Sequence, residues 1–134
     1  MKRKSILDSS ALLRFFQKES GAEIVKNKLE KAQQENQPLL LNLINLGEIY
    51  YIVKKKFGEE KLKETLILLE ELPISWYPIS KDLIIKAADL KADYDLPFVD
   101  AICAATALME DGDLLTSDPH FKKVEKEISI IWIL

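Results

Sequence analysis

The sequence predicts an α/β fold, a three-layer α/β/α sandwich around a mainly parallel sheet of about five strands. Two observations support this class: short apolar runs alternate with longer amphipathic stretches, and 134 residues suffice for one compact domain. The four glycines and five prolines are scattered, so no linker divides the sequence. We therefore expect a single domain spanning residues 1–134.

Five short apolar runs are the candidate strands. They lack a clean alternation of apolar and polar residues, as is typical of strands buried on both faces of a parallel sheet. Because helical patterns separate the runs, right-handed β-α-β crossovers are the expected connections. In chain order the runs are Ser5-Ile6-Leu7, Leu39-Leu40-Leu41, Ser75-Trp76-Tyr77, Leu114-Leu115-Thr116 and residues 128–134.

The stretches between these runs carry apolar residues at helical spacing. The expected helix ends also fit, since three lysines at 54–56 precede Gly58, and helix C-termini favour cations and glycine. Pro97 and Pro119 suit the first turn of a helix. The stripes are Ala22/Val25/Leu29/Ala32, Leu46/Ile49/Tyr50/Val53/Phe57, Leu62/Leu66/Leu69, Leu83/Ala87/Leu90 and Phe98/Ile102/Ala105/Met109.

The composition excludes several classes of protein. With 19 basic and 22 acidic residues the formal charge is -3, which excludes a histone-like protein but not nucleic-acid binding, since binding depends on where charge lies. The single cysteine, Cys103, forms no internal disulfide and is expected to be a small core residue. No apolar run is long enough to span a membrane, and Asp8 interrupts the run that a secretory signal needs. We expect a soluble, cytoplasmic protein with no membrane partner.

Four acidic residues are predicted at the carboxyl edge of the sheet, where open parallel sheets bind ligands. Asp8 directly follows the first strand, and Glu48 is expected in the first turn after the second strand. Asp100 is expected in the first turn of the helix that Pro97 opens, and Asp118 follows the end of the fourth strand. If these elements are neighbours in the sheet, the four carboxylates converge on one cleft.

Each acid taken singly also has a purely structural explanation. Asp8 and Asp118 suit helix N-caps, and Asn45 with Glu48 has the spacing of a capping box. Asp100 would complement a helix dipole. For any one acid at a helix start this explanation is the more common one, and it also holds for all four if the strands are not neighbours.

Four carboxylates in one cleft would need a counter-charge, because two of them 4 Å apart repel by about 4 kcal/mol at an effective dielectric constant near 20. A hard divalent cation supplies that charge, and Mg²⁺ or Mn²⁺ suits carboxylate oxygens better than zinc does. No histidine is expected near Asp8, Glu48 or Asp100. The only histidine, His120, is expected at the surface or at a helix start.

Four segments resemble the PIN-domain ribonucleases: LDSSALL at 7–13, Gly47-Glu48, VDAICAATA at 99–107 and LTSDPHF at 115–121. The resemblance covers nearly the whole chain in element order, and the small size is similar to the VapC-type toxins of toxin–antitoxin pairs. It implies a PIN-like fold and a Mg²⁺- or Mn²⁺-dependent endoribonuclease that hydrolyses RNA phosphodiester bonds. The resemblance also implies a homodimer and a small antitoxin that covers the cleft. The catalytic and metal-binding residues would be Asp8, Glu48, Asp100 and Asp118.

Three further residues are candidates for supporting roles. Thr116 or Ser117 would orient the last carboxylate or a metal-bound water, although either hydroxyl would equally suit a helix cap. Arg14, one or two turns after Asp8, is a candidate contact for an RNA phosphate.

Rival functions are weighed against the same residues. A haloacid-dehalogenase-type phosphatase needs a second aspartate where this chain has Ser10, and a receiver domain needs an acidic pair where it has Lys2-Arg3-Lys4. A non-catalytic PIN-like scaffold that binds RNA or protein is an alternative, and so is an RNA-processing nuclease without an antitoxin. Metal titration separates the scaffold from the enzyme, and a short neighbouring reading frame for an antitoxin separates the toxin from the processing nuclease.

Overall fold

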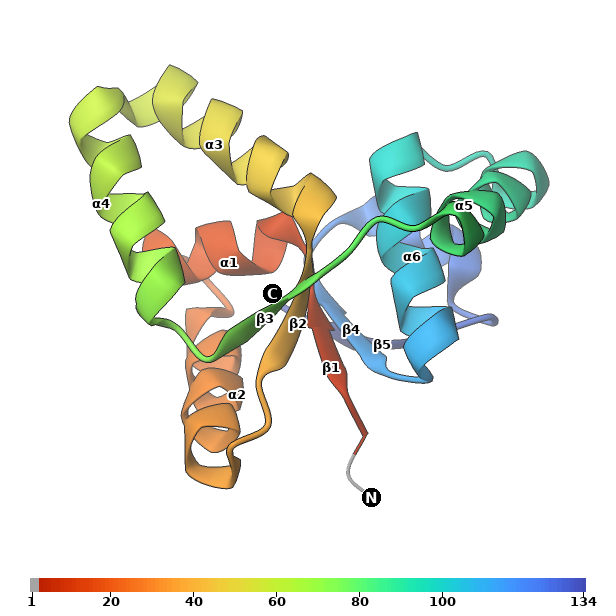
Figure 1. The fold of residues 1–134 in the computed structure, drawn as a ribbon, viewed down its shortest axis with the longest axis horizontal. Helices are drawn as coiled ribbons and strands as arrows, with labels where there is room; N and C mark the ends of the chain where they lie inside the picture. Colours follow the sequence, from red (N-terminus) through yellow and green to blue (C-terminus); the bar gives the residue numbers. More distant parts are fainter. Residues whose placement is uncertain (1–2) are drawn as a thin grey trace.

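The computed structural model describes residues 3–134 and contains one five-stranded sheet in the order β3-β2-β1-β4-β5 (Figure 1). Every neighbouring pair of strands is parallel, so the predicted parallel sheet is confirmed without an antiparallel exception. In the central strand, Leu7 lies in register with Leu41 on one side and Leu115 on the other. The strands are β1 (Ser5–Leu7), β2 (Leu39–Asn42), β3 (Ile74–Tyr77), β4 (Asp113–Thr116) and β5 (Ser129–Trp132).

The five predicted helical stripes all fall within helices of the structure. Several boundaries differ from prediction. Pro97 precedes its helix as the N-cap residue, and the last strand occupies only four residues of the 128–134 run. Strands β2, β3 and β4 are each one residue longer than the predicted run. The α-helices are α1 (Ser9–Phe16), α2 (Ala22–Glu35), α3 (Leu43–Phe57), α4 (Glu59–Glu71), α5 (Lys81–Tyr94) and α6 (Phe98–Glu110), and the 3₁₀ helix η1 spans Pro119–Val124.

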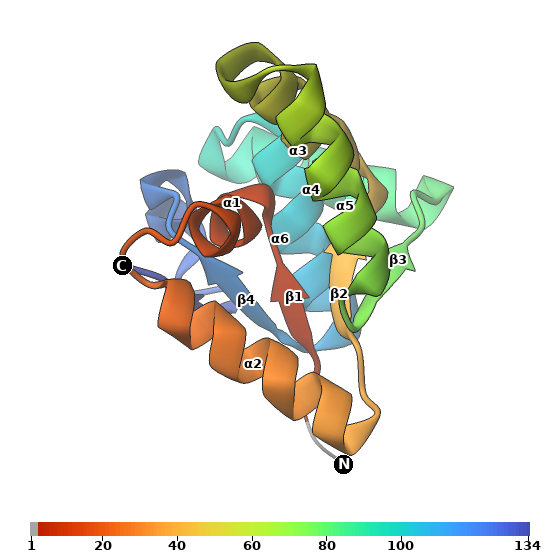
Figure 2. The ribbon, with the colours of Figure 1, turned by 90° about the vertical axis from the view of Figure 1, so that its left-hand side faces the viewer.

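The sheet separates two hydrophobic cores, as the sandwich prediction requires. Successive residues of a strand point to opposite faces, so Ile6 packs with residues of α5, α6 and η1, while Leu7 packs with residues of α1 to α4. Figure 2 looks onto the second of these layers, with α1 and α2 in front of the sheet. Both faces of the central strands are therefore covered, which explains why those strands are apolar without alternation.

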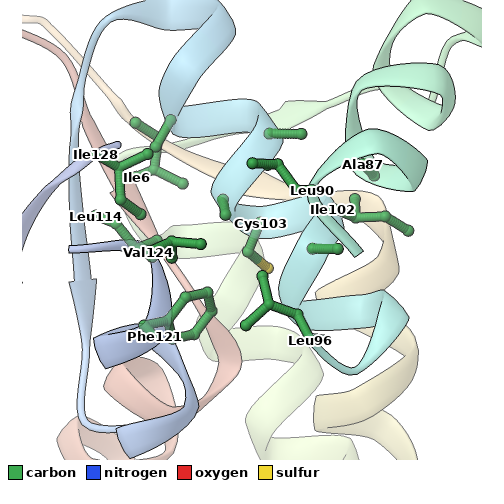
Figure 3. Packing of buried hydrophobic residues seen from close by; sticks show 14 of the residues in the cluster. Ile6, Ala87, Leu90, Leu96, Ile102, Cys103, Leu114, Phe121, Val124 and Ile128 are labelled. Atoms are coloured by element: carbon green, nitrogen blue, oxygen red, sulfur yellow. The ribbon is translucent and has the colours of Figure 1, made fainter. Parts of the chain in front are cut away.

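The middle of helix α6, from Ala101 to Ala107, is fully buried. Its many small side chains let the helix lie close to the sheet, and Figure 3 shows Cys103 of α6 within the surrounding apolar cluster. The expectation that Cys103 is a core residue is confirmed. Because α6 is held so firmly, its first turn, which carries Asp100, has a fixed position.

None of the helices among residues 3–134 has the length and apolar character needed to cross a membrane.

Candidate active site

Asp8 follows β1 and binds groups from two neighbouring elements. As the N-cap of α1, its Oδ1 accepts hydrogen bonds from the Ala11 amide at 3.0 Å and from the Ser10 hydroxyl at 2.7 Å. Its Oδ2 accepts a 2.5 Å hydrogen bond from the Thr116 hydroxyl at the end of β4. Asp8 is thus a helix cap, as the structural explanation predicted, and it also faces the end of the adjacent strand.

Asp118, which follows β4, likewise caps a helix and lies beside a neighbouring segment. It is the N-cap of η1, where its Oδ1 accepts a hydrogen bond from the His120 amide at 2.9 Å. Its own amide donates to the Thr116 hydroxyl at 3.0 Å, and the Ser117 amide donates to the Ser10 hydroxyl at 3.0 Å. The segment after β4 is therefore attached to the segment after β1, with the Thr116 side chain and the Ser117 backbone in the connection.

Glu48 lies one turn deeper in its helix than predicted. Strand β2 extends to Asn42, whose side chain caps α3 by accepting from the Ile44 amide at 2.9 Å, so Asn45 is not the cap and the capping-box interpretation is wrong. Asn45 instead donates to Glu48 Oε1 at 3.0 Å. The Ser9 hydroxyl donates to the same oxygen at 2.7 Å. Two donors on one oxygen fix the orientation of the Glu48 carboxylate.

A buried contact behind Asn45 extends this arrangement into the core. The Cys103 thiol donates to Asn45 Oδ1 at 3.3 Å, which sets the orientation in which the amide group of Asn45 faces Glu48. Asn45 is almost fully buried, and a buried amide needs such partners for both its donor and its acceptor. Cys103 therefore contacts Asn45, the residue that orients Glu48. Burial raises the pKa of the Cys103 thiol well above the usual value, which keeps the thiol protonated.

His120 lies between two of the predicted acids. Its Nδ1 is 3.0 Å from Oδ1 of Asp118 and 3.2 Å from Oδ2 of Asp100 in the first turn of α6. The expectation that no histidine lies near Asp100 is therefore wrong. The reason is local: Pro119 opens a tight 3₁₀ turn, and the second residue of that turn is brought back beside its N-cap, Asp118.

The four acids act on one another electrostatically. Burial, followed by the charge of Asp118, raises the pKa of Asp100 to about 7, while His120 opposes the rise and the charges of Asp8 and Glu48 add to it. Burial also raises the pKa of Asp8 to about 6, although the hydrogen bonds from Thr116, Ser10 and Ala11 lower it and the charge of Asp118 raises it. The predicted acids therefore occupy one electrostatic environment, which raises the pKa values of Asp8 and Asp100.

The donor atoms of this region fit a divalent cation. One atom each from Asp100, Asp118 and His120 lie within 4.8 Å of one another, which is the spacing of ligands around a single ion. The side chains of Asp100 and Asp118 are 14% and 27% exposed, so both are accessible from solvent at the carboxyl edge of the sheet. Carboxylate oxygens with retained waters suit Mg²⁺ and Mn²⁺.

Arg14 lies at the far end of α1 from Asp8, where its Nη1 donates to the carbonyl oxygen of Ser20 at 2.9 Å. Its contact with an RNA phosphate stays a prediction.

The sequence reasoning missed Ser9, Ser10, Asn45 and the position of His120. Their signal was proximity in sequence to the predicted acids: both serines directly follow Asp8, and His120 stands two residues after a capping aspartate. Hydroxyl and amide side chains at helix starts are so common as caps that this signal alone does not mark them as partners of a site.

Comparison with known proteins places the chain in a family. No curated protein matches the chain. Similar solved structures include a toxin–antitoxin complex from Klebsiella pneumoniae (22% identity, 96% of each chain covered, TM-score 0.68) and VapBC2 from Rickettsia felis bound to a DNA fragment from its promoter (18% identity, 96% of this chain and 97% of that chain, TM-score 0.76). VapC20 of Mycobacterium tuberculosis, a Sarcin-Ricin loop cleaving toxin, shows 17% identity over 89% of this chain and 93% of its own, with a TM-score of 0.65. At these identities the likeness concerns the fold. The family model of the PIN domain matches residues 5–127, and the chain therefore belongs to the PIN domain family.

Proposed function

We propose that this protein is a divalent-metal-dependent endoribonuclease that hydrolyses RNA phosphodiester bonds and serves as the toxin of a toxin–antitoxin pair. The observation that carries the proposal is the meeting of Asp100, Asp118 and His120 within 4.8 Å at the carboxyl edge of a PIN-family sheet. Asp8 and Glu48 are linked to this group by hydrogen bonds: the Thr116 hydroxyl contacts both Asp8 and the Asp118 amide, and Ser9, the residue after Asp8, donates to Glu48.

The four acids are the proposed holders of the cation. When bound, a divalent cation lowers the pKa of water and neutralises the charge that develops on a phosphate during hydrolysis. The protein holds its carboxylates ready for this task, because Asp8 is fixed by Thr116 and Ser10, and Glu48 by Ser9 and Asn45. Groups held in place before the reaction need no reorganisation when the charge changes.

The proposed partners follow from the structural neighbours. The Klebsiella pneumoniae and Rickettsia felis structures are toxin–antitoxin assemblies with nearly the same chain length and fold. A small antitoxin is therefore the partner that we propose for this chain. The resemblance to VapC-type toxins is the basis for two further parts of the proposal, that the antitoxin covers the acidic edge and that the chain forms a homodimer.

Cleavage assays on purified protein test the enzymatic part of the proposal. Structured and single-stranded RNAs are incubated with wild type, Asp8→Asn and Glu30→Gln, with Mn²⁺ or with EDTA. Glu30 is the matched control because it is an exposed acid on α2, which leads into the amino end of β2. Wild type and Glu30→Gln should cleave with Mn²⁺ only, and Asp8→Asn should lose activity by orders of magnitude.

Two results would overturn the assignment. One is undiminished cleavage by Asp8→Asn in a nuclease-free preparation. The other is the absence of a multi-carboxylate Mn²⁺ site in a metal titration of wild type, which would favour a non-catalytic binding domain.

Expression in cells tests the toxin part separately. Induction of wild type alone should arrest growth, and co-expression of a short reading frame adjacent to the gene should restore it. Growth that continues normally under induction, with active enzyme recovered from the same cells, would instead support an RNA-processing nuclease.

A further inference from the structure

We propose that His120 is a nitrogen ligand of the cation and that it makes the site prefer a transition-metal ion of the Mn²⁺ class over Mg²⁺. This inference deepens the proposed function and rests on it, because it concerns the cation held by the same acids. The sequence pattern alone suggested a site made only of oxygen ligands, and the position of His120 changes that donor set.

The distances around His120 suit side chains that bind the same ion. Its Nδ1 is 3.0 Å from an oxygen of Asp118 and 3.2 Å from an oxygen of Asp100. Neighbouring ligands of an octahedral ion with bonds of about 2.1 Å are separated by roughly 3 Å. The distances from the imidazole nitrogen to the two carboxylate oxygens are therefore those between neighbouring ligands of a single six-coordinate ion.

The imidazole is also held in this position by the fold. The His120 amide donates to Asp118 Oδ1 at 2.9 Å, so backbone and ring both face the same carboxylate. The next residue, Phe121, is fully buried in the core beneath η1, which anchors the short helix against the sheet. The His120 side chain itself is 53% exposed, and it remains accessible to an ion entering from solvent.

Ligand chemistry gives the direction of the preference. Mg²⁺ binds oxygen ligands almost exclusively and keeps several of its waters, whereas imidazole nitrogen is a good ligand for first-row transition metals. Adding one imidazole to the carboxylates of the site therefore raises its affinity for Mn²⁺ and changes its affinity for Mg²⁺ little.

A protonated His120 ring that donates hydrogen bonds to the two carboxylates would show the same distances. The two arrangements differ in one observable, because only a coordinated nitrogen carries electron-spin density from Mn²⁺. Pulsed electron paramagnetic resonance of the Mn²⁺-loaded protein detects this coupling to nitrogen-14 directly and does not depend on enzymatic activity.

The experiment compares wild type, His120→Gln and Lys122→Gln, each loaded with Mn²⁺. Lys122 is an exposed cation on the same 3₁₀ helix and controls for loss of positive charge. We expect nitrogen-14 coupling in wild type and Lys122→Gln and none in His120→Gln. In calorimetric titrations, the Mn²⁺ affinity of His120→Gln should fall roughly 10- to 100-fold, the range found for groups that support metal sites, while its Mg²⁺ affinity should change little.

Bound Mn²⁺ without nitrogen coupling in wild type would overturn the inference and leave the carboxylate site of the proposed function intact. Equal losses of Mn²⁺ and Mg²⁺ affinity in His120→Gln would overturn the stated preference. Failure of wild type to bind Mn²⁺ at all would overturn the inference together with the metal dependence of the proposed function. A His120→Ala variant serves as a second test, because alanine offers no ligand atom, and its circular dichroism spectrum shows whether the fold is retained.

Discussion

The hydroxyl group of Thr116, the last residue of β4, donates a 2.5 Å hydrogen bond to Oδ2 of Asp8, the residue that follows β1. The same hydroxyl accepts a hydrogen bond from the Asp118 amide, so one buried side chain holds two of the proposed metal ligands at their positions. Short hydrogen bonds to a carboxylate are among the stronger ones in proteins, because the acceptor is charged. The ends of two adjacent parallel strands are thereby joined at the proposed active site.

Replacing Thr116 with valine should weaken cleavage while preserving the shape of the core. Valine fills nearly the same volume but donates no hydrogen bond, and losing a bond to a charged group costs about 1.5–3 kcal/mol. We expect the rate of Mn²⁺-dependent cleavage at pH 8 to fall roughly 10- to 100-fold on that basis. Thr116→Ser keeps the hydroxyl and should remain close to wild type. Equal rates for the valine and serine variants would show that the hydrogen bond has no part in the activity.

The contribution of Asp8 to the stability of the metal-free protein should decrease as the pH rises from about 4 to above 6. Burial raises the pKa of Asp8 from 3.8 to about 6 in the folded state, so the folded protein binds a proton over a range where the unfolded chain has released it. The stabilisation is complete below the unfolded pKa and is lost through the folded pKa, and it amounts to about 3 kcal/mol. Urea unfolding in EDTA across this pH range measures it.

Two variants isolate the contribution of Asp8 to that pH dependence. Asp8→Asn cannot titrate and should show a flatter dependence than wild type, whereas Glu30→Gln should retain the full slope. Saturating Mn²⁺ should stabilise wild type most at high pH, because protons then compete least for the carboxylates. A slope in Asp8→Asn equal to that of wild type would contradict the assignment.

The two donors that bind Glu48 Oε1 should matter jointly. Ser9→Ala and Asn45→Ala each remove one hydrogen bond, so each should reduce the cleavage rate only several-fold while the other donor still orients the carboxylate. The double variant should approach the rate of Glu48→Gln. Rates measured under single-turnover conditions for the four variants test this, and a double variant that loses no more than the product of the single losses would speak against a shared role.

Two glycines should respond in opposite ways to substitution with alanine. A Cβ at Gly47, exposed in the middle of α3, would meet nothing within 4 Å, so alanine should stabilise the protein by about 0.5–1 kcal/mol through helix propensity. A Cβ at Gly112 would lie 2.6 Å from Ile6 Cδ1 and 2.7 Å from the Lys4 carbonyl oxygen, so alanine should destabilise it by about 1–3 kcal/mol. Urea unfolding measures the stability of both variants. A destabilised Gly47→Ala would mean that α3 needs its glycine for another reason.

Local patterns predicted the strands and helices of this protein because burial on both faces of a parallel sheet leaves a direct trace in the sequence. The order of the strands in the sheet could not be predicted from such local patterns. The convergence of the acids was conditional on which strands are neighbours, and only the pairing of β1 with both β2 and β4 fulfils that condition. Pairing between residues more than a hundred positions apart is decided by the packing of the whole core.

The errors at Asn45 and His120 have a shared physical origin. Asn42 and Asn45 are both good N-caps, and the choice between them depends on how far β2 continues, which its register with Tyr77 of β3 determines. The place of His120 depends on a single 3₁₀ turn after Pro119, where a regular α-helix would have carried the ring elsewhere. Both outcomes depend on the conformation of one or two residues. Secondary-structure propensities are too coarse to predict the ends of strands and helices with that precision.

The central place of β1 in the sheet also determines when the proposed site can form during synthesis of the chain. Asp8 emerges from the ribosome before its partner Thr116, which lies 108 residues later, and the β4 neighbour of β1 is made only after α6. At about 5–20 residues per second, that interval is roughly 5–20 s. During this interval Asp118 and His120 have not yet been synthesised, so a partly synthesised chain carries an incomplete set of ligands for the cation. If the protein cleaves RNA as proposed, a chain that has not yet been extended to Asp118 lacks part of the proposed metal site.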